Sequence, residues 1–446
     1  MTDPYFLILV VLLVLHTTRA DLPLEFEYRN TVRWPSLGPS ASVGNGLFVA
    51  YNGTHTLAMD ENTHPNSTNV ANYGYSAWEL IETNEGPSRR ISHQIAFLTN
   101  NGLFLVYGGV DVNNSSKYFN DAYLLSLSYN EKNEQVGTWT RTTDGPSARS
   151  DHQMTTFGQQ ILTYGGHDDN GNFNDAYLFS LSSNEKNEQV GTWTRTTDGP
   201  SSRFNHRMAS MGQNILLMYG GMNTPYPPYL NPYLNDAYIV SLSTNGDSNG
   251  KNEKIIWTRT TDGPSARAFH DMASIGPNIL MYGGCVDSIN GLNCFNDAYL
   301  FSLSSNETNG KVGTWTKTVD GPSARGWHQM VSIDHNVLMY GGYGSNNNIY
   351  GSNRYINDAY IFSFVFNIKN EKVGKWTRTK DVPSARWSHQ MAAIGPDILM
   401  YGGKQIRTEK LNGRTQYLDD AFLFSLSYNE KNGQVGTWIR TADGPS

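Results

Sequence analysis

The chain of 446 residues repeats one sequence pattern six times, and this repetition constrains its fold more than any other feature. Each copy opens with Pro-Ser, continues through an Arg and a His three residues later, and reaches an apolar run that ends in Tyr-Gly-Gly. Asn-Asp-Ala-Tyr or a near copy follows, and then a polar turn and a Trp. Successive tryptophans of the pattern lie 54 to 64 residues apart. A long, regular period of this kind is the signature of a repeat architecture.

Each copy contains four short β-type segments, which in the second copy are HQMTTF, ILTYGG, AYLFSL and TWTRT. Side chains alternate along a strand, so Tyr177, Phe179 and Leu181 share one face of the third segment and Ala176 and Leu178 share the other. Both faces are therefore apolar, and a lone four-stranded sheet cannot bury them both. Stacking such sheets radially around an axis does bury them. The sequence therefore predicts an all-β propeller with four-stranded blades.

The double Gly after an apolar strand, the spaced Tyr and the Trp resemble the kelch repeat over roughly Gly86 to Trp438. The resemblance implies a kelch-type β-propeller of the galactose oxidase-like superfamily that serves as an interaction surface. We divide the chain into residues 1–20, a signal peptide; 21–85, a degenerate blade or ring-closing segment; and 86–446, six kelch-type repeats of one propeller. Seven blades are predicted because NGLFVAYNG at 45–53 mirrors NGLFLVYGG at 101–109, with six blades as the alternative.

The first residues favour secretion. Phe6 to Leu15 is an unbroken apolar run, too short to span a bilayer but suited to the core of a secretory signal, with Ala20 at the cleavage point. A membrane anchor is the alternative, and no other segment is expected to cross a membrane. In an oxidising compartment Cys285 and Cys294 are expected to pair, whereas they would be free thiols if there is no signal. Candidate glycosylation sites are Asn52, Asn66, Asn113, Asn114 and Asn306.

Residues that recur in every copy are predicted to serve the fold. In the second copy these are Arg149, His152, Gly165, Gly166, Tyr177 and Trp193. A ring of six His could hold a metal, but the ligand spacing of known metal motifs is absent, so we expect neither a metal nor another cofactor. The turn YNEKNEQVG at Tyr129 returns almost unchanged at Ser183, which predicts a uniform, solvated face.

Residues that vary between copies are predicted to form a binding face. In kelch-like propellers the two positions between the Arg and the His approach the mouth of the central channel, and the loop after Gly-Gly varies beside them. Aromatic and Arg side chains on variable loops of a rigid scaffold are typical of binding surfaces. The alternative is drift in unconstrained loops. The candidates are Asp151, Phe204, Asn205, Phe269, Trp327, Trp387, Tyr226, Tyr229, Tyr350, Arg354, Arg407 and Arg414.

Charge and motifs narrow the function classes. The net charge of −7 and the lack of a basic stripe argue against nucleic acid. We expect a monomeric, secreted, non-catalytic scaffold that binds a protein or a glycan. One alternative is a carbohydrate-active propeller enzyme similar to galactose oxidase, whose copper site needs a Cys joined to a Tyr, a second Tyr and two His. That prediction is disfavoured because both cysteines are expected to pair with each other. The other alternative is a kelch adaptor, although such proteins usually carry BTB or F-box partners.

Overall fold

The structure is a computed structural model, and all its described elements are strands. The described residues are 9–12, 48–51, 56–59, 79–83, 86–88, 90–98, 103–111, 114–129, 135–183, 189–212, 214–223, 232–243, 254–288, 291–305, 311–344, 355–379, 383–387, 389–394, 397–401, 404–406, 415–417, 421–429 and 433–440. Within these ranges no helix is long and apolar enough to cross a membrane.

Five antiparallel four-stranded sheets follow one another along the chain, and we call them units 2 to 6. Unit 2 comprises β11 (Gln153–Phe157), β12 (Gln160–Tyr164), β15 (Ala176–Ser183) and β16 (Gln189–Arg195). Unit 3 comprises β17 (Arg207–Ser210), β18 (Ile215–Tyr219), β19 (Ala237–Leu242) and β20 (Ile255–Arg259). Unit 4 comprises β21 (Asp271–Ile275), β22 (Asn278–Tyr282), β25 (Ala298–Ser305) and β26 (Lys311–Lys317). Unit 5 comprises β27 (Gln329–Ile333), β28 (Asn336–Tyr340), β29 (Ala359–Phe366) and β30 (Lys372–Arg378). Unit 6 comprises β31 (Gln390–Ile394), β32 (Asp397–Tyr401), β35 (Ala421–Asn429) and β36 (Gly433–Arg440).

An eight-stranded sheet joins two further groups of four strands through the parallel pair β4 and β10. Unit 1 comprises β6 (Gln94–Leu98), β7 (Leu103–Tyr107), β9 (Ala122–Tyr129) and β10 (Gln135–Arg141). The N-terminal unit comprises β1 (Leu9–Leu12), β2 (Phe48–Tyr51), β3 (Thr56–Met59) and β4 (Glu79–Thr83). Short two-stranded pairs lie beside the sheets: β5 (Arg90–Ile91) with β8 (Val110–Asp111), β13 (His167–Asp168) with β14 (Gly171–Asn172), β23 (Cys285–Ser288) with β24 (Gly291–Cys294), and β33 (Lys404–Ile406) with β34 (Thr415–Tyr417).

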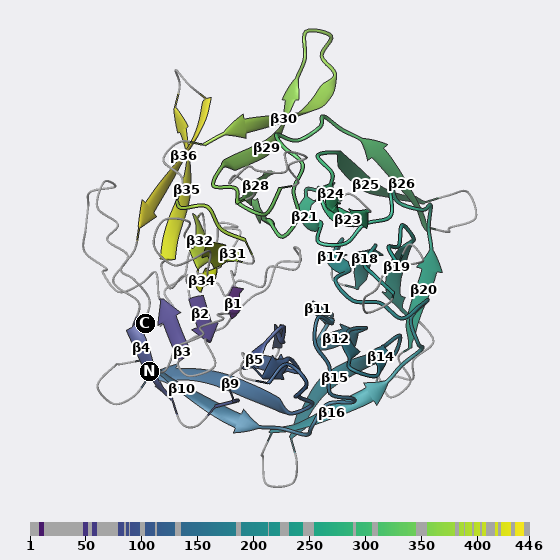
Figure 1. Cartoon of the computed structure of the whole chain (residues 1–446), viewed down its shortest axis with the longest axis vertical. Helices are drawn as coiled ribbons and strands as arrows, with labels where there is room; N and C mark the ends of the chain where they lie inside the picture. The colour runs from purple at the N-terminus through teal and green to yellow at the C-terminus, as the bar shows by residue number, and fades with distance from the viewer. Residues whose placement is uncertain are drawn as a thin grey trace, which may run out of the picture.

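The sheets stand around a common axis, as the propeller prediction requires (Figure 1). The first strand of each unit is innermost and contacts the first strand of the next unit. Strand β1 contacts both β6 and β31, so the N-terminal unit lies between the first and the last repeats. Residues 9–12 of β1 fall inside the predicted signal peptide. The N-terminal unit would make a seventh blade, and the number of blades stays a prediction.

Both faces of the sheets are buried, as the alternation of side chains predicts. On one face of β15, Phe179 packs with Leu105 and Tyr107 of unit 1. On the other face, Ala176 and Leu178 join the core shared with unit 3. Phe179 and Ala176 are fully inaccessible to solvent. Each blade therefore completes the core of both its neighbours, which is why four strands suffice for a unit.

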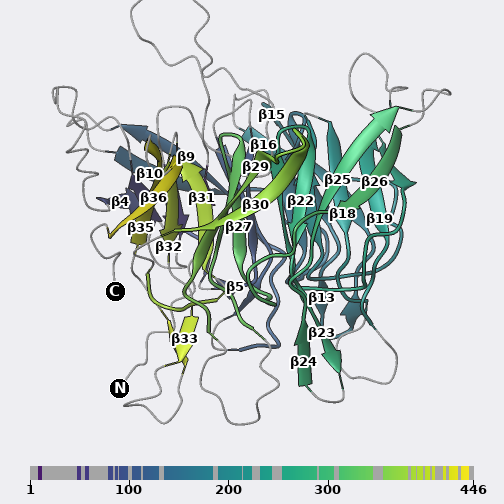
Figure 2. The same ribbon diagram turned by 90° about the horizontal axis from the view of Figure 1, so that it is seen from above.

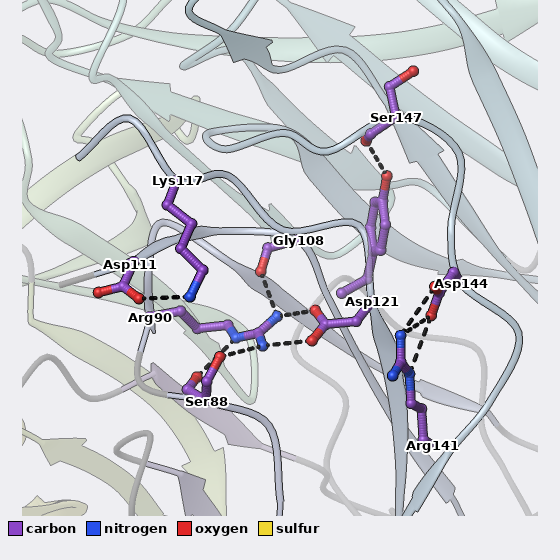
Figure 3. A network of polar contacts seen from close by, with 10 residues as sticks. Ser88, Arg90, Gly108, Asp111, Lys117, Asp121, Arg141, Asp144 and Ser147 are labelled. Carbon is purple, nitrogen blue, oxygen red and sulfur yellow. Dashed lines mark hydrogen bonds and ion pairs between the residues drawn. The ribbon is translucent and has the colours of Figure 1, made fainter. Parts of the chain in front are cut away.

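A buried Arg holds each of units 1 to 5 together internally. In unit 1, Arg90 donates hydrogen bonds to both carboxylate oxygens of Asp121 and to the carbonyl oxygens of Gly108 and Ser88 (Figure 3). In unit 2, Arg149 contacts Asp175 in the same way, at 2.6 and 2.8 Å. The Asp comes from Asn-Asp-Ala-Tyr, so this motif supplies the counter-ion of a buried guanidinium. A buried charge needs such a partner.

The Tyr-Gly-Gly of one unit packs on the Arg and His of the next. The Gly166 amide of unit 2 donates a hydrogen bond of 2.8 Å to the carbonyl oxygen of Arg203 in unit 3. The preceding Gly165 has φ of +71°, and a Cβ on it would lie 2.5 Å from that same oxygen and 3.0 Å from the His206 ring. Only glycine adopts this backbone while letting the neighbouring blade come so close. The Tyr-Gly-Gly motif is therefore a contact between blades.

Candidate functional site

The described parts of the variable loops in units 2, 4 and 6 gather on one face of the ring. In the side view, β13, β23, β24 and β33 all lie toward one end of the molecule (Figure 2). These strands follow Tyr-Gly-Gly in units 2, 4 and 6. In units 2 to 5 the segment between the Arg and the His reaches the same place, because its first residue pairs with the residue that follows the double glycine. We therefore sought the site where these segments meet the variable loops.

The first residue between the Arg and the His is buried in units 2 to 4. The exposed fraction is 2% for Ser150, 8% for Phe204 and 0% for Ala268. Each pairs with the residue that follows the double glycine of its own unit, which for Phe204 is Met222. Phe204 packs on Met222, Tyr233 and Ala268 in a small separate core. Phe204 is thus largely covered by its neighbours, and its role in ligand binding stays a prediction.

The second residue between the Arg and the His has a left-handed backbone in units 1 to 5. The residues, here called the mouth ring, are Ser92 (φ 54°), Asp151 (52°), Asn205 (51°), Phe269 (60°) and Trp327 (54°). The amide of Asp151 donates to the carbonyl oxygen of Ser92 at 3.2 Å, and the amide of Trp327 donates to that of Phe269 at 3.0 Å. Neighbouring units are thus linked at this level. All five side chains are half-buried, so each still reaches solvent.

Aromatic side chains occupy one side of the mouth. Phe269 and Trp327 stack at 3.9 Å between ring centroids, with an interplanar angle of 20°. Tyr355 and Trp387 stack at 4.7 Å and 24°. Tyr343 joins the two pairs, at 6.0 Å from Trp327 and 5.5 Å from Tyr355. These five residues, here called the aromatic arc, come from units 4, 5 and 6. The predicted residues Phe269, Trp327 and Trp387 are therefore brought together.

Polar side chains occupy the units on the other side. The Asp151 carboxylate lies 3.1 Å from Nε2 of His167. Burial lowers the pKa of His167, but the hydrogen bond and the charge of Asp151 outweigh burial, so the pKa lies above its ordinary value. Asp168 instead closes its own turn by accepting hydrogen bonds from the amides of Asn170 and Gly171. Ser92, Asp151, His167 and Asn205 therefore form a polar arc that can accept and donate hydrogen bonds.

A disulfide braces the aromatic arc. Cys285 and Cys294 are bonded to each other and are directly opposite in the hairpin of β23 and β24. The pair expected from the sequence is therefore present. A Cβ on Gly326 would lie 2.6 Å from the sulfur of Cys285 and 3.3 Å from Cβ of Phe269. The sulfur thus packs under the backbone that carries Trp327, which explains why unit 5 has Gly at this position.

The sequence analysis missed a charged pair beside the mouth. Arg207 and Asp271 begin the innermost strands of units 3 and 4, and their side chains are 3.1 Å apart. Asp271 is buried and also accepts a hydrogen bond of 2.7 Å from the Met330 amide. Burial raises the pKa of Asp271 despite the charge of Arg207. The sequence did carry a signal for this pair. Four of the six repeats have Gln immediately after the His, whereas units 3 and 4 have Arg207 and Asp271 at this position.

The predicted structural residues lie inside the blades. His152 is fully buried and meets Tyr107 of unit 1 edge-on, at 5.1 Å. Trp193 is half-buried between Phe179 and Tyr107. Tyr177 is half-buried on β15. Among the described residues, no three His, Cys, Asp or Glu side chains lie close enough together to bind a metal ion.

Several predicted sites fall outside the described residues. These are Tyr226, Tyr229, Tyr350, Arg354, Arg407 and Arg414 among the binding candidates, and Asn52, Asn66, Asn113 and Asn306 among the glycosylation candidates. Asn114 is described and lies in an exposed turn on the loop of unit 1, where its side-chain oxygen accepts a hydrogen bond of 3.2 Å from the Ser116 amide.

The chain is similar to several known proteins. The family model described as "KLHDC2/KLHL20/DRC7 Kelch-repeats domain" matches residues 40–284 and 192–403. A probable serine/threonine-protein kinase of Dictyostelium discoideum is 25% identical over 239 residues, which are 46% of this chain and 17% of that protein. Multiple epidermal growth factor-like domains protein 8 of Homo sapiens is 24% identical over 348 residues, 74% of this chain and 11% of that protein. The chain thus spans only a small part of these relatives. The solved structure of YjhT superposes with a TM-score of 0.48 at 13% identity, covering 76% of this chain and 96% of that one.

Proposed function

Because the chain belongs to the kelch-repeat family, we propose that it is a non-catalytic, secreted binding module that holds a protein ligand against its aromatic arc. A kelch-repeat domain is an interaction scaffold, so the open question is which surface this one uses. The observation that carries the proposal is the aromatic arc itself, in which side chains from three units converge at one mouth. A glycan is the second candidate ligand, because stacked aromatic rings also suit sugar faces.

Backbone strain supports the mouth as the site. A left-handed conformation is a genuine outlier for bulky residues such as Phe269 and Trp327. Such strain costs on the order of 1–3 kcal/mol per residue and gathers at binding and active sites. Drift in unconstrained loops would not place the two largest side chains of the mouth ring in its least favourable conformation. Half-buried aromatic side chains on a rigid base are also the usual anchors of protein interfaces.

Two further features support the remaining parts of the proposal. Cys285 and Cys294 are joined to each other, so neither sulfur is left for the bond to Tyr that a galactose oxidase-like site requires. The same disulfide, the apolar run from Phe6 to Leu15 and the exposed Asn114 sequon suit an oxidising, extracellular setting.

The test is selection of ligands against the protein secreted from residue 21. A displayed random-peptide library and a glycan array are probed with the parent protein and with Trp327→Ala and Trp387→Ala. Truncating a central anchor should weaken binding at least about 30-fold. Phe366→Ser, which removes an exposed aromatic ring on the rim, is the matched control and should bind like the parent. Ligands whose affinity neither Trp substitution changes would refute the mouth as the binding site.

A further inference from the structure

The β29–β30 hairpin of unit 5 departs from the other repeats. It aligns without gaps with the β15–β16 hairpin of unit 2, and the strand pairing has the same register. The shared positions include Asn367, Asn370 and Glu371, which match Asn184, Asn187 and Glu188. Among the positions that differ, Ser183 and Glu185 of unit 2 become Phe366 and Ile368, whereas Gln189 and Thr192 become Lys372 and Lys375. The unit 5 hairpin is therefore exposed to solvent but is not uniform with the turns at Tyr129 and Ser183.

The tip of this hairpin presents two large apolar side chains to solvent. The exposed fraction is 70% for Phe366 and 103% for Ile368, the two highest values among the exposed large apolar residues of the described chain. The hairpin extends outward from the ring at its rim (Figure 1). Neither side chain therefore folds back onto the blade, although burying such groups is the usual source of stability.

A rigid turn holds the two side chains in place. The side-chain oxygen of Asn367 accepts hydrogen bonds from the amides of Lys369 and Glu371, both at 2.9 Å. The side-chain nitrogen of Asn367 donates to the Glu371 carboxylate at 2.8 Å. Asn370 supplies the left-handed residue of the turn, with φ of 59°. The tip is thus preorganised, and little conformational entropy remains to be lost on docking.

The charge around the tip is positive. Lys369, Lys372 and Lys375 are all exposed, and the ammonium of Lys372 lies 4.2 Å from the ring centroid of Phe364. Glu371 is the one acidic residue from Phe366 to Trp376. The hairpin is therefore a cationic, apolar projection on a chain whose net charge is −7.

We propose that the β29–β30 hairpin docks on an anionic lipid surface, with Phe366 and Ile368 entering the headgroup region and the three lysines meeting lipid phosphates and carboxylates. Exposed apolar side chains backed by Lys are the pattern of interfacial anchors. Two side chains at a tip provide far less area than the roughly 800 Å² per partner of a typical protein interface, whereas a bilayer accepts a small insertion. The lysines match a negative surface, and the tip lies at the rim, clear of the aromatic arc.

The test is co-sedimentation with vesicles of phosphatidylcholine alone and of phosphatidylcholine mixed with phosphatidylserine. The parent protein should sediment with the mixed vesicles only. The variant Phe366→Ser/Ile368→Glu carries the unit 2 residues and should lose this binding. Lys372→Gln/Lys375→Thr keeps the apolar tip and should bind roughly 30-fold more weakly, since each Lys near an anionic surface contributes about one factor of five.

Controls separate this site from the mouth and from general stickiness. Ile256→Ser removes an exposed apolar side chain from β20, and Trp327→Ala alters the aromatic arc, so both should sediment like the parent. Phe366→Trp should show a blue shift in fluorescence on addition of mixed vesicles. Equal binding to both vesicle types, no binding by the parent, or full binding by Phe366→Ser/Ile368→Glu would each overturn the proposal. Each variant keeps the shared turn residues, and circular dichroism checks that it is folded.

Discussion

Acidification should unfold this protein because six histidines are buried in their neutral form. The six recurring His side chains, one in each of units 1 to 6, are at most 2% exposed: His93, His152, His206, His270, His328 and His389. Burial, followed by the charge of the Arg three residues earlier, lowers the pKa of each. For His93 the pKa falls to about 3.

Proton linkage gives the sign and the size of the change in the free energy of unfolding with pH. Below about pH 6.5 the unfolded chain binds protons at these six positions and the native protein does not. The native state therefore has its full stability above this pH and loses it as the pH falls toward the lowered native pKa values. Between pH 7.5 and 5.5 each His reduces the free energy of unfolding by about 1.4 kcal/mol, and the six together by roughly 8 kcal/mol. Typical domains have only about 5–15 kcal/mol in total.

Two identified groups oppose this trend. The pKa of His167 lies above its ordinary value, so its pairing with Asp151 gains stability as the pH falls. Burial also raises the pKa of Asp271, so its carboxyl binds a proton more readily in the native state than in the unfolded chain. Because these are two groups against six, the unfolded state should still take up a net four protons or more at pH 5.5. This uptake is the quantity to compare with experiment.

The assay is urea unfolding at pH 7.5, 6.5 and 5.5, with the slope of unfolding free energy against pH giving the proton uptake. The matched variant is His152→Leu, which has a similar volume and no titratable ring. In the described chain neither ring nitrogen of His152 has a hydrogen-bond partner, so its loss leaves no group unsatisfied. Its slope should be smaller by about one proton. A total loss under about 2 kcal/mol, or an unchanged slope for His152→Leu, would refute the reasoning.

Three more predictions test other parts of the structure. Cys285→Ser/Cys294→Ser should lower the free energy of unfolding by about 2–3 kcal/mol, because the disulfide closes a short loop, and should lower the affinity of ligands for the aromatic arc. Equal affinity with and without the disulfide would contradict the bracing role. Arg207→Gln leaves the buried carboxylate of Asp271 without its cation and should lower the free energy of unfolding by about 3 kcal/mol, measured by thermal unfolding. Arg207→Gln/Asp271→Gln, which restores the Gln of the other units, should recover most of this loss, and a double variant no more stable than the single one would contradict the pairing argument. After expression in secreting cells, measurement of the intact mass should show a mature chain that begins at Asp21. A chain that retains β1 would show that residues 9–12 belong to the fold and that the signal prediction is wrong.

The sequence predicted the blades because repetition and strand alternation express packing directly. Phe179 and Ala176 lie on opposite faces of β15 regardless of the conformation of the loops. The role of Asp175 was missed, because Asn-Asp before a strand is also ordinary turn chemistry. The recurrence of an Arg and an Asp in every copy was the available signal for that ion pair.

The site was less predictable because its geometry depends on backbone conformation. Phe204 and Asn205 are adjacent and both vary between repeats, yet one is buried and the other reaches solvent. Which of the two side chains is buried depends on the left-handed turn at Asn205. The stacking of Tyr355 on Trp387 likewise joins a loop of unit 5 to unit 6, a contact between residues that no sequence spacing relates.

The contact between Tyr-Gly-Gly and the following Arg and His has a consequence for folding. The five junctions from unit 1 to unit 6 use the same residue types, so the junction alone does not distinguish the correct neighbour from a later repeat or from a second molecule. Misassembly and swapping between near-identical repeats are characteristic failures of such chains. Emergence of the repeats from the ribosome in order favours the correct partner, because it is the first one available. Refolding from denaturant removes that order, so aggregation should rise steeply with protein concentration during refolding while the protein made in cells remains monodisperse.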